Sequence, residues 1–153
     1  MRTSGLLAFL ILTSGCGIPL SSEGGDWQDS PPFKKSFDEV WNATLAVVES
    51  KGLHLQVQDK VSGRILTEWK VHLDPRWREG NRERVEAEIL PVTGQAEKRF
   101  RVRLRVPRDT NDDAKNPMSE KEAAWVSSGG NDETRDELLY RIQMKLKGPG
   151  LDD

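Results

Sequence analysis

Four runs of alternating apolar and polar residues constrain the fold of this 153-residue chain more than any other feature of its sequence. The inward members of the runs are Leu53, Leu55 and Val57; Ile65, Thr67, Trp69, Val71 and Leu73; Val85, Ala87 and Ile89; and Phe100, Val102, Leu104 and Val106. Period two is typical of half-buried strands, because successive side chains of a strand point to opposite faces. We therefore expect an antiparallel sheet with one face on a core and the other in water.

Two amphipathic segments flank these runs. A capping-box signature at Ser36–Glu39 begins a helical apolar pattern that ends at Gly52, and a second helix is expected from Asp132 or Thr134 through Leu146. Each helix must bury its apolar stripe, and the inner face of the sheet is the only large partner available. The predicted fold class is α+β: a two-layer sandwich of helix, four antiparallel strands and helix, of the helix-grip kind.

The third and fourth runs predict their own register. A two-residue loop at Thr93–Gly94 pairs Glu88 with Arg99 and Glu86 with Arg101 on the outer face, and it pairs apolar residues on the inner face. A slip by one residue would spoil both faces. Further along, the same register sets two arginines opposite each other, which is unfavourable unless the loop is longer or a partner supplies anions.

The polarity and the glycines of the connecting segments predict their structure. Asp59–Gly63 is expected to be a turn whose aspartate accepts hydrogen bonds from turn amides, and Asp74–Asn81 a polar hairpin loop. Pro107–Ser119 has no periodicity and is expected to be a mobile loop. A short helix carrying Trp125 is expected at Ser119–Val126.

The N-terminus carries an export pattern. A positive residue, the seven apolar residues Leu6–Leu12 and then small residues are typical of a secretory signal, and seven residues are too few to span a bilayer. The small residues lie directly before Cys16, the only cysteine of the chain. They resemble a bacterial lipobox, after which the cysteine is acylated, although Thr13 stands where leucine is usual. The alternative is an ordinary secretory signal with an incidental cysteine.

These observations divide the chain into four parts. We expect a lipoprotein signal peptide at residues 1–15, a flexible tether from acylated Cys16 at 16–35, a folded domain at 36–147 and a disordered tail at 148–153. By analogy with bacterial sorting, Gly17 after the cysteine favours the outer membrane, with the domain on its periplasmic face.

A family resemblance rests on Val40–Trp41 in the first helix, on Gly52–Leu53 and on Asp59–Trp69. This order resembles BamC-type (NlpB/DapX) outer-membrane lipoproteins, in which a helix with a Val-Trp pair precedes a hairpin of similar sequence. The resemblance implies a lipid-anchored accessory subunit of the machinery that assembles outer-membrane proteins, and it brings no catalytic residues. This chain has room for one helix-grip domain, whereas such proteins usually carry two.

Two groups of residues are candidate contacts for a partner. Arg76, Trp77 and Arg78 lie at the tip of the Asp74–Asn81 loop, and Trp and Arg are enriched at interaction hot spots. Arg101 and Arg103 belong to a row of arginines on the outer face of the fourth strand. The alternatives are a tryptophan folded back onto the sheet and a solvated face partly paired with glutamates.

Composition excludes several function classes. A net charge of −2 argues against a nucleic-acid binder, and a single cysteine excludes a disulfide framework and a four-cysteine zinc site. Two histidines, in separate strands, favour neither a metal centre nor a catalytic pair. The nucleotide-binding and hydrolase motifs are absent. We expect no enzyme activity, no metal and no cofactor.

Two hypotheses of function remain. The first is a lipid-anchored outer-membrane accessory protein that binds an envelope protein through its folded domain. The second is a carrier of a small molecule or lipid, which needs a cavity between the helices and the sheet. Trp41 and Trp69 are expected in the core, or lining that cavity in the carrier.

Overall fold

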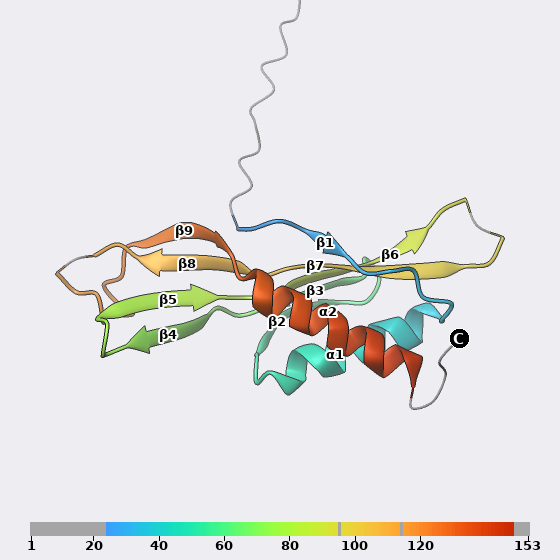
Figure 1. Cartoon of the computed structure of the whole chain (residues 1–153), viewed down its shortest axis with the longest axis horizontal. Helices are drawn as coiled ribbons and strands as arrows, with labels where there is room; N and C mark the ends of the chain where they lie inside the picture. Colours follow the sequence, from blue (N-terminus) through green and yellow to red (C-terminus); the bar gives the residue numbers. More distant parts are fainter. Residues whose placement is uncertain (1–23, 95, 114, 149–153) are drawn as a thin grey trace, which may run out of the picture.

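The computed structural model describes residues 24–94, 96–113 and 115–148 (Figure 1). This part of the chain contains two helices and nine strands. In chain order they are β1 (Gln28–Asp29), α1 (Phe37–Ser50), β2 (Leu55–Asp59), β3 (Arg64–Thr67), β4 (Lys70–Asp74), β5 (Glu79–Glu83), β6 (Glu86–Val92), β7 (Arg99–Arg105), β8 (Pro107–Asn111), β9 (Trp125–Gly130) and α2 (Asp132–Lys147). The α+β class is confirmed. The predictions for the signal peptide, for Cys16 and for residues 149–153 lie outside the described residues.

The strands form two antiparallel sheets. One has five strands in the order β1-β7-β6-β3-β2, and the other has four in the order β4-β5-β8-β9. The second sheet continues the first, because β3 leads into β4, β5 into β6 and β7 into β8 after one or two residues. Both helices lie across the five-stranded sheet, and the four-stranded sheet projects beyond them (Figure 1).

The core lies between the helices and the five-stranded sheet. Its buried apolar residues are Val40, Trp41, Ala43, Val47 and Val48 of α1; Ile65, Val85, Ala87, Ile89, Val102, Leu104 and Val106 of the sheet; and Leu138, Leu139, Ile142 and Leu146 of α2. The capping box at the start of α1 is confirmed: the Ser36 hydroxyl accepts from the Glu39 amide at 3.2 Å, and the Glu39 carboxylate accepts from the Ser36 amide at 2.9 Å. Trp41, with 2% of its surface exposed, is a core residue as predicted.

The prediction of four strands is wrong, because the described residues form nine. The second run breaks in two between β3 and β4, and β5 begins at Glu79, inside the predicted Asp74–Asn81 loop. At the break, the Thr67 hydroxyl accepts a hydrogen bond from the Val85 amide at 2.9 Å, and the Glu68 amide donates to the carbonyl of His54 at 2.8 Å. The interruption moves Trp69 off the inward face, so Trp69 is half-buried on the other side of the sheet rather than in the core.

The predicted hairpin register is also wrong. Glu86 lies opposite Arg105 and Glu88 opposite Arg103, a shift of four residues along β7. The connection between the two strands runs from residue 93 to 98 instead of occupying two residues. A shift by an even number keeps every side chain on its face, so the pairing of Glu with Arg and of apolar with apolar residues survives.

Residues 107–130 contain two strands where the sequence predicted a loop and a helix. β8 pairs with β5 and with β9, and Trp125 begins β9. The alternating apolar signal is missing here because no described helix covers this part of the sheet, so its strands need no continuous apolar face.

The folded domain begins before residue 36. β1 pairs with β7, Phe33 forms a bridge with Phe100, and Ser30 is buried. The Ser30 hydroxyl accepts from the Val102 amide at 2.9 Å, and its own amide donates to the Val102 carbonyl at 2.8 Å. Residues 24–35 are therefore part of the domain and not of a free tether.

Candidate functional site

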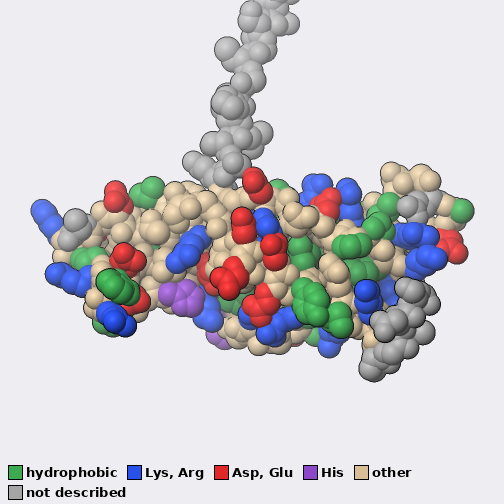
Figure 2. Space-filling model, in the orientation of Figure 1, with side chains coloured by type: hydrophobic (Ala, Val, Ile, Leu, Met, Phe, Trp, Pro, Cys, Tyr) green, Lys and Arg blue, Asp and Glu red, His purple; other side chains and the backbone are tan. Residues whose placement is uncertain are grey.

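The loop of residues 75–78 ends the projecting four-stranded sheet. The Asp74 carboxylate accepts from the amides of Arg76 at 2.9 Å and of Trp77 at 3.3 Å, which fixes the loop backbone. Trp77 is 66% exposed, and the Arg76 guanidinium lies 5.4 Å from its ring centroid. Arg78 adopts a left-handed φ of 52°. The structure thus brings Arg76, Trp77 and Arg78 together, and Figure 2 has basic and hydrophobic side chains side by side at this end.

A second surface lies on the side of the sheets opposite the helices, and we call it the arginine face. Its charged residues are Arg64, Arg82, Arg84, Arg99, Arg101, Arg103 and Arg105, with Asp29, Asp59, Glu86, Glu88 and Asp109. Seven arginines against five carboxylates leave an excess of two positive charges in a chain of net charge −2. The face therefore favours anions.

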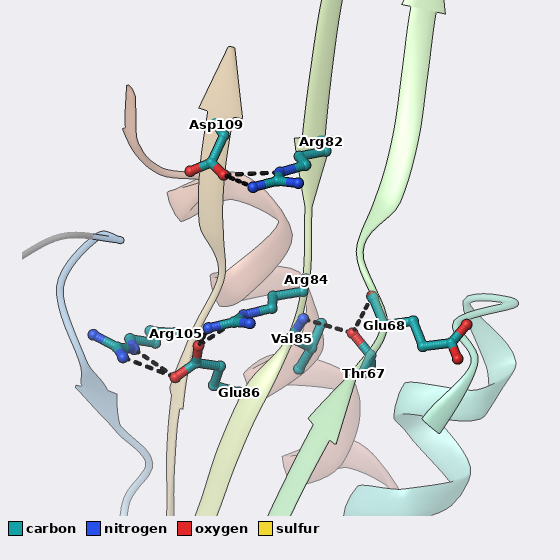
Figure 3. A network of polar contacts seen from close by, with 8 residues as sticks. All are labelled: Thr67, Glu68, Arg82, Arg84, Val85, Glu86, Arg105 and Asp109. Carbon is teal, nitrogen blue, oxygen red and sulfur yellow. Dashed lines mark hydrogen bonds and ion pairs between the residues drawn. The ribbon is translucent and has the colours of Figure 1, made fainter. Parts of the chain in front are cut away.

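Glu86 organises the centre of the arginine face (Figure 3). One carboxylate oxygen accepts from Nε of Arg84 at 2.9 Å and from its Nη2 at 2.6 Å. The other accepts from Nε and Nη2 of Arg105 at 2.9 and 2.8 Å. The Glu86 side chain is only 11% exposed. Because its single negative charge is shared between Arg84 and Arg105, it neutralises these two arginines only in part.

Asp29 plays the same part at the edge of the sheet. Its two carboxylate oxygens accept from Arg101 and from Arg103, each at 2.9 Å. The hydrogen bond to Asp29 holds the pKa of Arg103 above its ordinary value, and Glu88 adds a smaller attraction. The two predicted arginines are therefore on the surface and close together, but they are partly neutralised and belong to a different sheet from the Trp77 loop.

Tryptophans and arginines stack where the two sheets meet. The Arg82 guanidinium lies 4.4 Å from the ring centroid of Trp69 and 4.8 Å from that of Trp125. Arg84 lies 4.6 Å from the Trp69 centroid. Asp109 accepts from both Nε and Nη2 of Arg82 at 2.8 Å and fixes its orientation (Figure 3).

A pocket of about 340 Å³ opens beside this stack. Gly24, Trp69, Arg84, Pro107, Asp109, Trp125 and Ser127 line it. The pocket combines aromatic walls with a guanidinium and a carboxylate, groups that recognise a polar or charged partner by stacking and hydrogen bonding. Ser127 and Asp109 lie opposite each other in its lining, and no hydrogen bond joins their side chains.

Sequence reasoning missed this stack. Trp69 was expected in the core and Trp125 on a helix, and Arg82 and Arg84 were not singled out. The signal was present in two arginines two residues apart, one in β5 and one just after it. Their tryptophan partners were harder to predict, because Trp69 lies in the connection between β3 and β4 and Trp125 begins a strand that no apolar pattern indicates.

The described ranges contain neither a cluster of metal-binding side chains nor a helix that could cross a membrane. No cluster of three or more His, Cys, Asp or Glu side chains there is arranged to hold a metal ion. Neither described helix combines the length and the apolar character that a bilayer crossing needs.

The chain matches no protein-family model and no curated protein.

Proposed function

We propose that this chain is a lipid-anchored outer-membrane accessory protein that binds an envelope protein through its projecting four-stranded sheet. The observation that carries the proposal is Trp77, a tryptophan 66% exposed between two arginines at the tip of that sheet. Burying an exposed tryptophan in a partner's pocket removes apolar surface from water, which favours binding, and the flanking guanidinium groups can add directional hydrogen bonds.

The loop is suited to this role because its backbone is ordered before a partner binds. The amides of Arg76 and Trp77 donate hydrogen bonds to the Asp74 carboxylate, and the β4–β5 pairing on either side restrains residues 75–78 further. A preordered loop loses less conformational entropy on binding. Leu73, 39% exposed in the adjoining strand, extends the apolar part of the surface.

We further propose that the five-stranded sheet with its two helices is a helix-grip-like unit, and that the protein binds rather than catalyses. The resemblance of Val40–Trp41 and Asp59–Trp69 to BamC-type lipoproteins supports a role beside the outer-membrane protein assembly machinery. The carrier alternative gains no support, because sixteen buried apolar side chains of the described residues fill the layer between helices and sheet.

The partner surface is tested by crosslinking and recovery of the tagged protein from the native envelope. Trp77→Ala and Arg78→Ala are expected to lose the crosslinked partner while the melting temperature stays within about 1 °C of the parent. Tyr140→Ala, which removes a similarly exposed aromatic ring from α2, is the matched control and is expected to keep the partner. Equal recovery with all three variants would overturn the assignment of the loop, and a lowered melting temperature for Trp77→Ala would place its ring in a structural role.

The anchor is tested separately by membrane fractionation. We expect the parent protein in the outer-membrane fraction and Cys16→Ala in the soluble periplasm. The anchor is refuted if both proteins fractionate alike in the soluble periplasm.

A further inference from the structure

The first described residues lie on the arginine face. Gly24 is buried against Pro107 and lines the pocket that holds Trp69 and Arg84. At Gly25, a Cβ atom would lie 2.6 Å from the Cα of Gly130, and the φ of 83° also favours glycine. This close backbone contact fixes where the N-terminal segment meets the domain, on the side away from the helices (Figure 1).

Only seven residues separate Cys16 from Gly24. A fully extended chain spans at most about 3.3–3.6 Å per residue, so the Cα atoms of these two residues are at most about 30 Å apart. Acylation of Cys16, which is part of the proposed function, would therefore hold the arginine face within about 30 Å of the bilayer. A free tether of twenty residues, which the sequence predicts, would let any face of the domain turn toward the bilayer.

Charge is distributed unevenly between the two sides of the domain. The arginine face has an excess of two positive charges, whereas α1 carries Asp38, Glu39 and Glu49 without a basic residue and α2 carries four acidic and four basic residues. Acidic side chains gather over the start of α2 in Figure 2. Lys35 pairs with Glu39 and Lys60 with Asp38, which offsets two of the three acidic charges of α1. An anionic surface would therefore attract the arginine face more strongly than the helix layer.

The arginine face also has hydrogen-bond donors to offer. The Arg99 and Arg101 side chains are 27% and 38% exposed, so their terminal Nη groups can reach a headgroup, whereas their Nε atoms are shielded from solvent. Guanidinium groups bind phosphate through several N–H donors at once. Trp27, stacked with Arg105 at 4.6 Å, and the two tryptophans of the pocket are residues that favour the boundary between water and lipid.

We propose that the arginine face docks on the headgroups of anionic phospholipids, so that the domain sits with its sheet toward the bilayer and its helices away from it. The proposal rests on the proposed anchor for the nearness of the bilayer, but the affinity of the face is its own property. The Trp77 loop, at the end of the projecting sheet, remains available to a protein partner beside the membrane.

Vesicle flotation tests the proposal. The protein used is the chain from residue 16 onward with Cys16→Ser, which retains every described residue. It is expected to float with vesicles of phosphatidylglycerol and phosphatidylethanolamine at low salt, and not with phosphatidylcholine vesicles. The double variant Arg99→Gln/Arg101→Gln is expected to bind about 25-fold more weakly, at about fivefold for each charge near a surface. The control, Arg141→Gln/Lys145→Gln, removes two charges from α2 and is expected to change binding less than twofold.

The orientation of the domain on the vesicle is measured with single cysteines introduced into the Cys16→Ser protein. A polarity-sensitive dye on Ser127→Cys, beside the pocket, is expected to shift its emission to the blue on anionic vesicles, whereas the same dye on Asn42→Cys of α1 is expected not to shift. The proposal is overturned if the chain does not bind, if the two double variants bind equally, or if both dyes respond alike. It is also overturned if the Arg99/Arg101 variant loses only a protein crosslink.

The two proposals fail separately. Vesicle binding by the unacylated chain, together with a soluble parent protein on fractionation, would refute the anchor alone. An acylated, membrane-bound parent whose unacylated form ignores anionic vesicles would refute the docking face alone.

Discussion

Replacing Glu86 by glutamine tests whether one carboxylate holds the arginine face together. The change keeps the shape of the side chain but removes its charge, and it replaces one acceptor oxygen by an amide that donates toward an arginine. Breaking a fully buried ion pair costs about 3–5 kcal/mol. The Arg84 and Arg105 side chains keep 29% and 23% exposure, so water partly replaces the lost acceptor and we expect a loss of about 2–3 kcal/mol.

This loss corresponds to a fall in melting temperature of about 6–12 °C for a domain of this size. Chemical denaturation and calorimetry measure both quantities. Glu88→Gln is the matched control: it lies on the same face of the same strand, opposite Arg103, but its side chain has no ion pair with another described residue. We expect it to cost less than about 0.5 kcal/mol. Equal losses for the two variants would refute the reasoning, because the arginines would then be stabilised by water and not by Glu86.

The remaining predictions concern the edge of the domain, one turn and the core. Ser30→Ala is expected to lower the free energy of unfolding by about 1–3 kcal/mol, since the buried Val102 amide loses its acceptor; denaturant titration measures it. Hydrogen bonds from the Ser62 hydroxyl and amide lower the pKa of Asp59, so this carboxylate stabilises the fold above its ordinary pKa and loses that effect as the pH falls through the lowered one. Ser62→Ala is therefore expected to raise the pKa of Asp59 toward its ordinary value, which an NMR titration detects. Trp41→Ala is expected to cost about 3–5 kcal/mol by thermal denaturation, because its indole is buried beneath α1.

The sequence predicted what local chemistry determines. The capping box at Ser36 depends on residues within one turn, and the Asp59 carboxylate accepts from the Val61 and Ser62 amides as expected. Gly63 ends that turn at a φ of 73°, with its missing Cβ 2.7 Å from a backbone carbonyl of β6. At such positions one residue type satisfies both the turn and the close contact, so the pattern is informative by itself.

The register between strands was less predictable, because registers that differ by an even number of residues pair the same types of side chain. Shifting β7 by four residues exchanges Arg101 for Arg105 opposite Glu86 and leaves the chemistry of the pair unchanged. The choice between such registers depends on the summed pairing energy along both strands and on the length of the connecting loop. β8 and β9 were missed for another reason: their order comes from backbone hydrogen bonds to β5 and to each other, not from an apolar face.

The stacking of arginine on tryptophan explains how a sheet without a helix over it is ordered. Trp69 and Trp125 present large ring faces, and the Arg82 guanidinium lies over both. Asp109 holds that guanidinium in place, so a charged side chain covers apolar surface that a helix would otherwise cover. Guanidinium groups suit this role because their flat faces stack while their edges still donate hydrogen bonds. Because Asp109 neutralises Arg82, the stack orders the projecting sheet without adding net charge, and the positive excess of the arginine face comes mainly from the four arginines of β7.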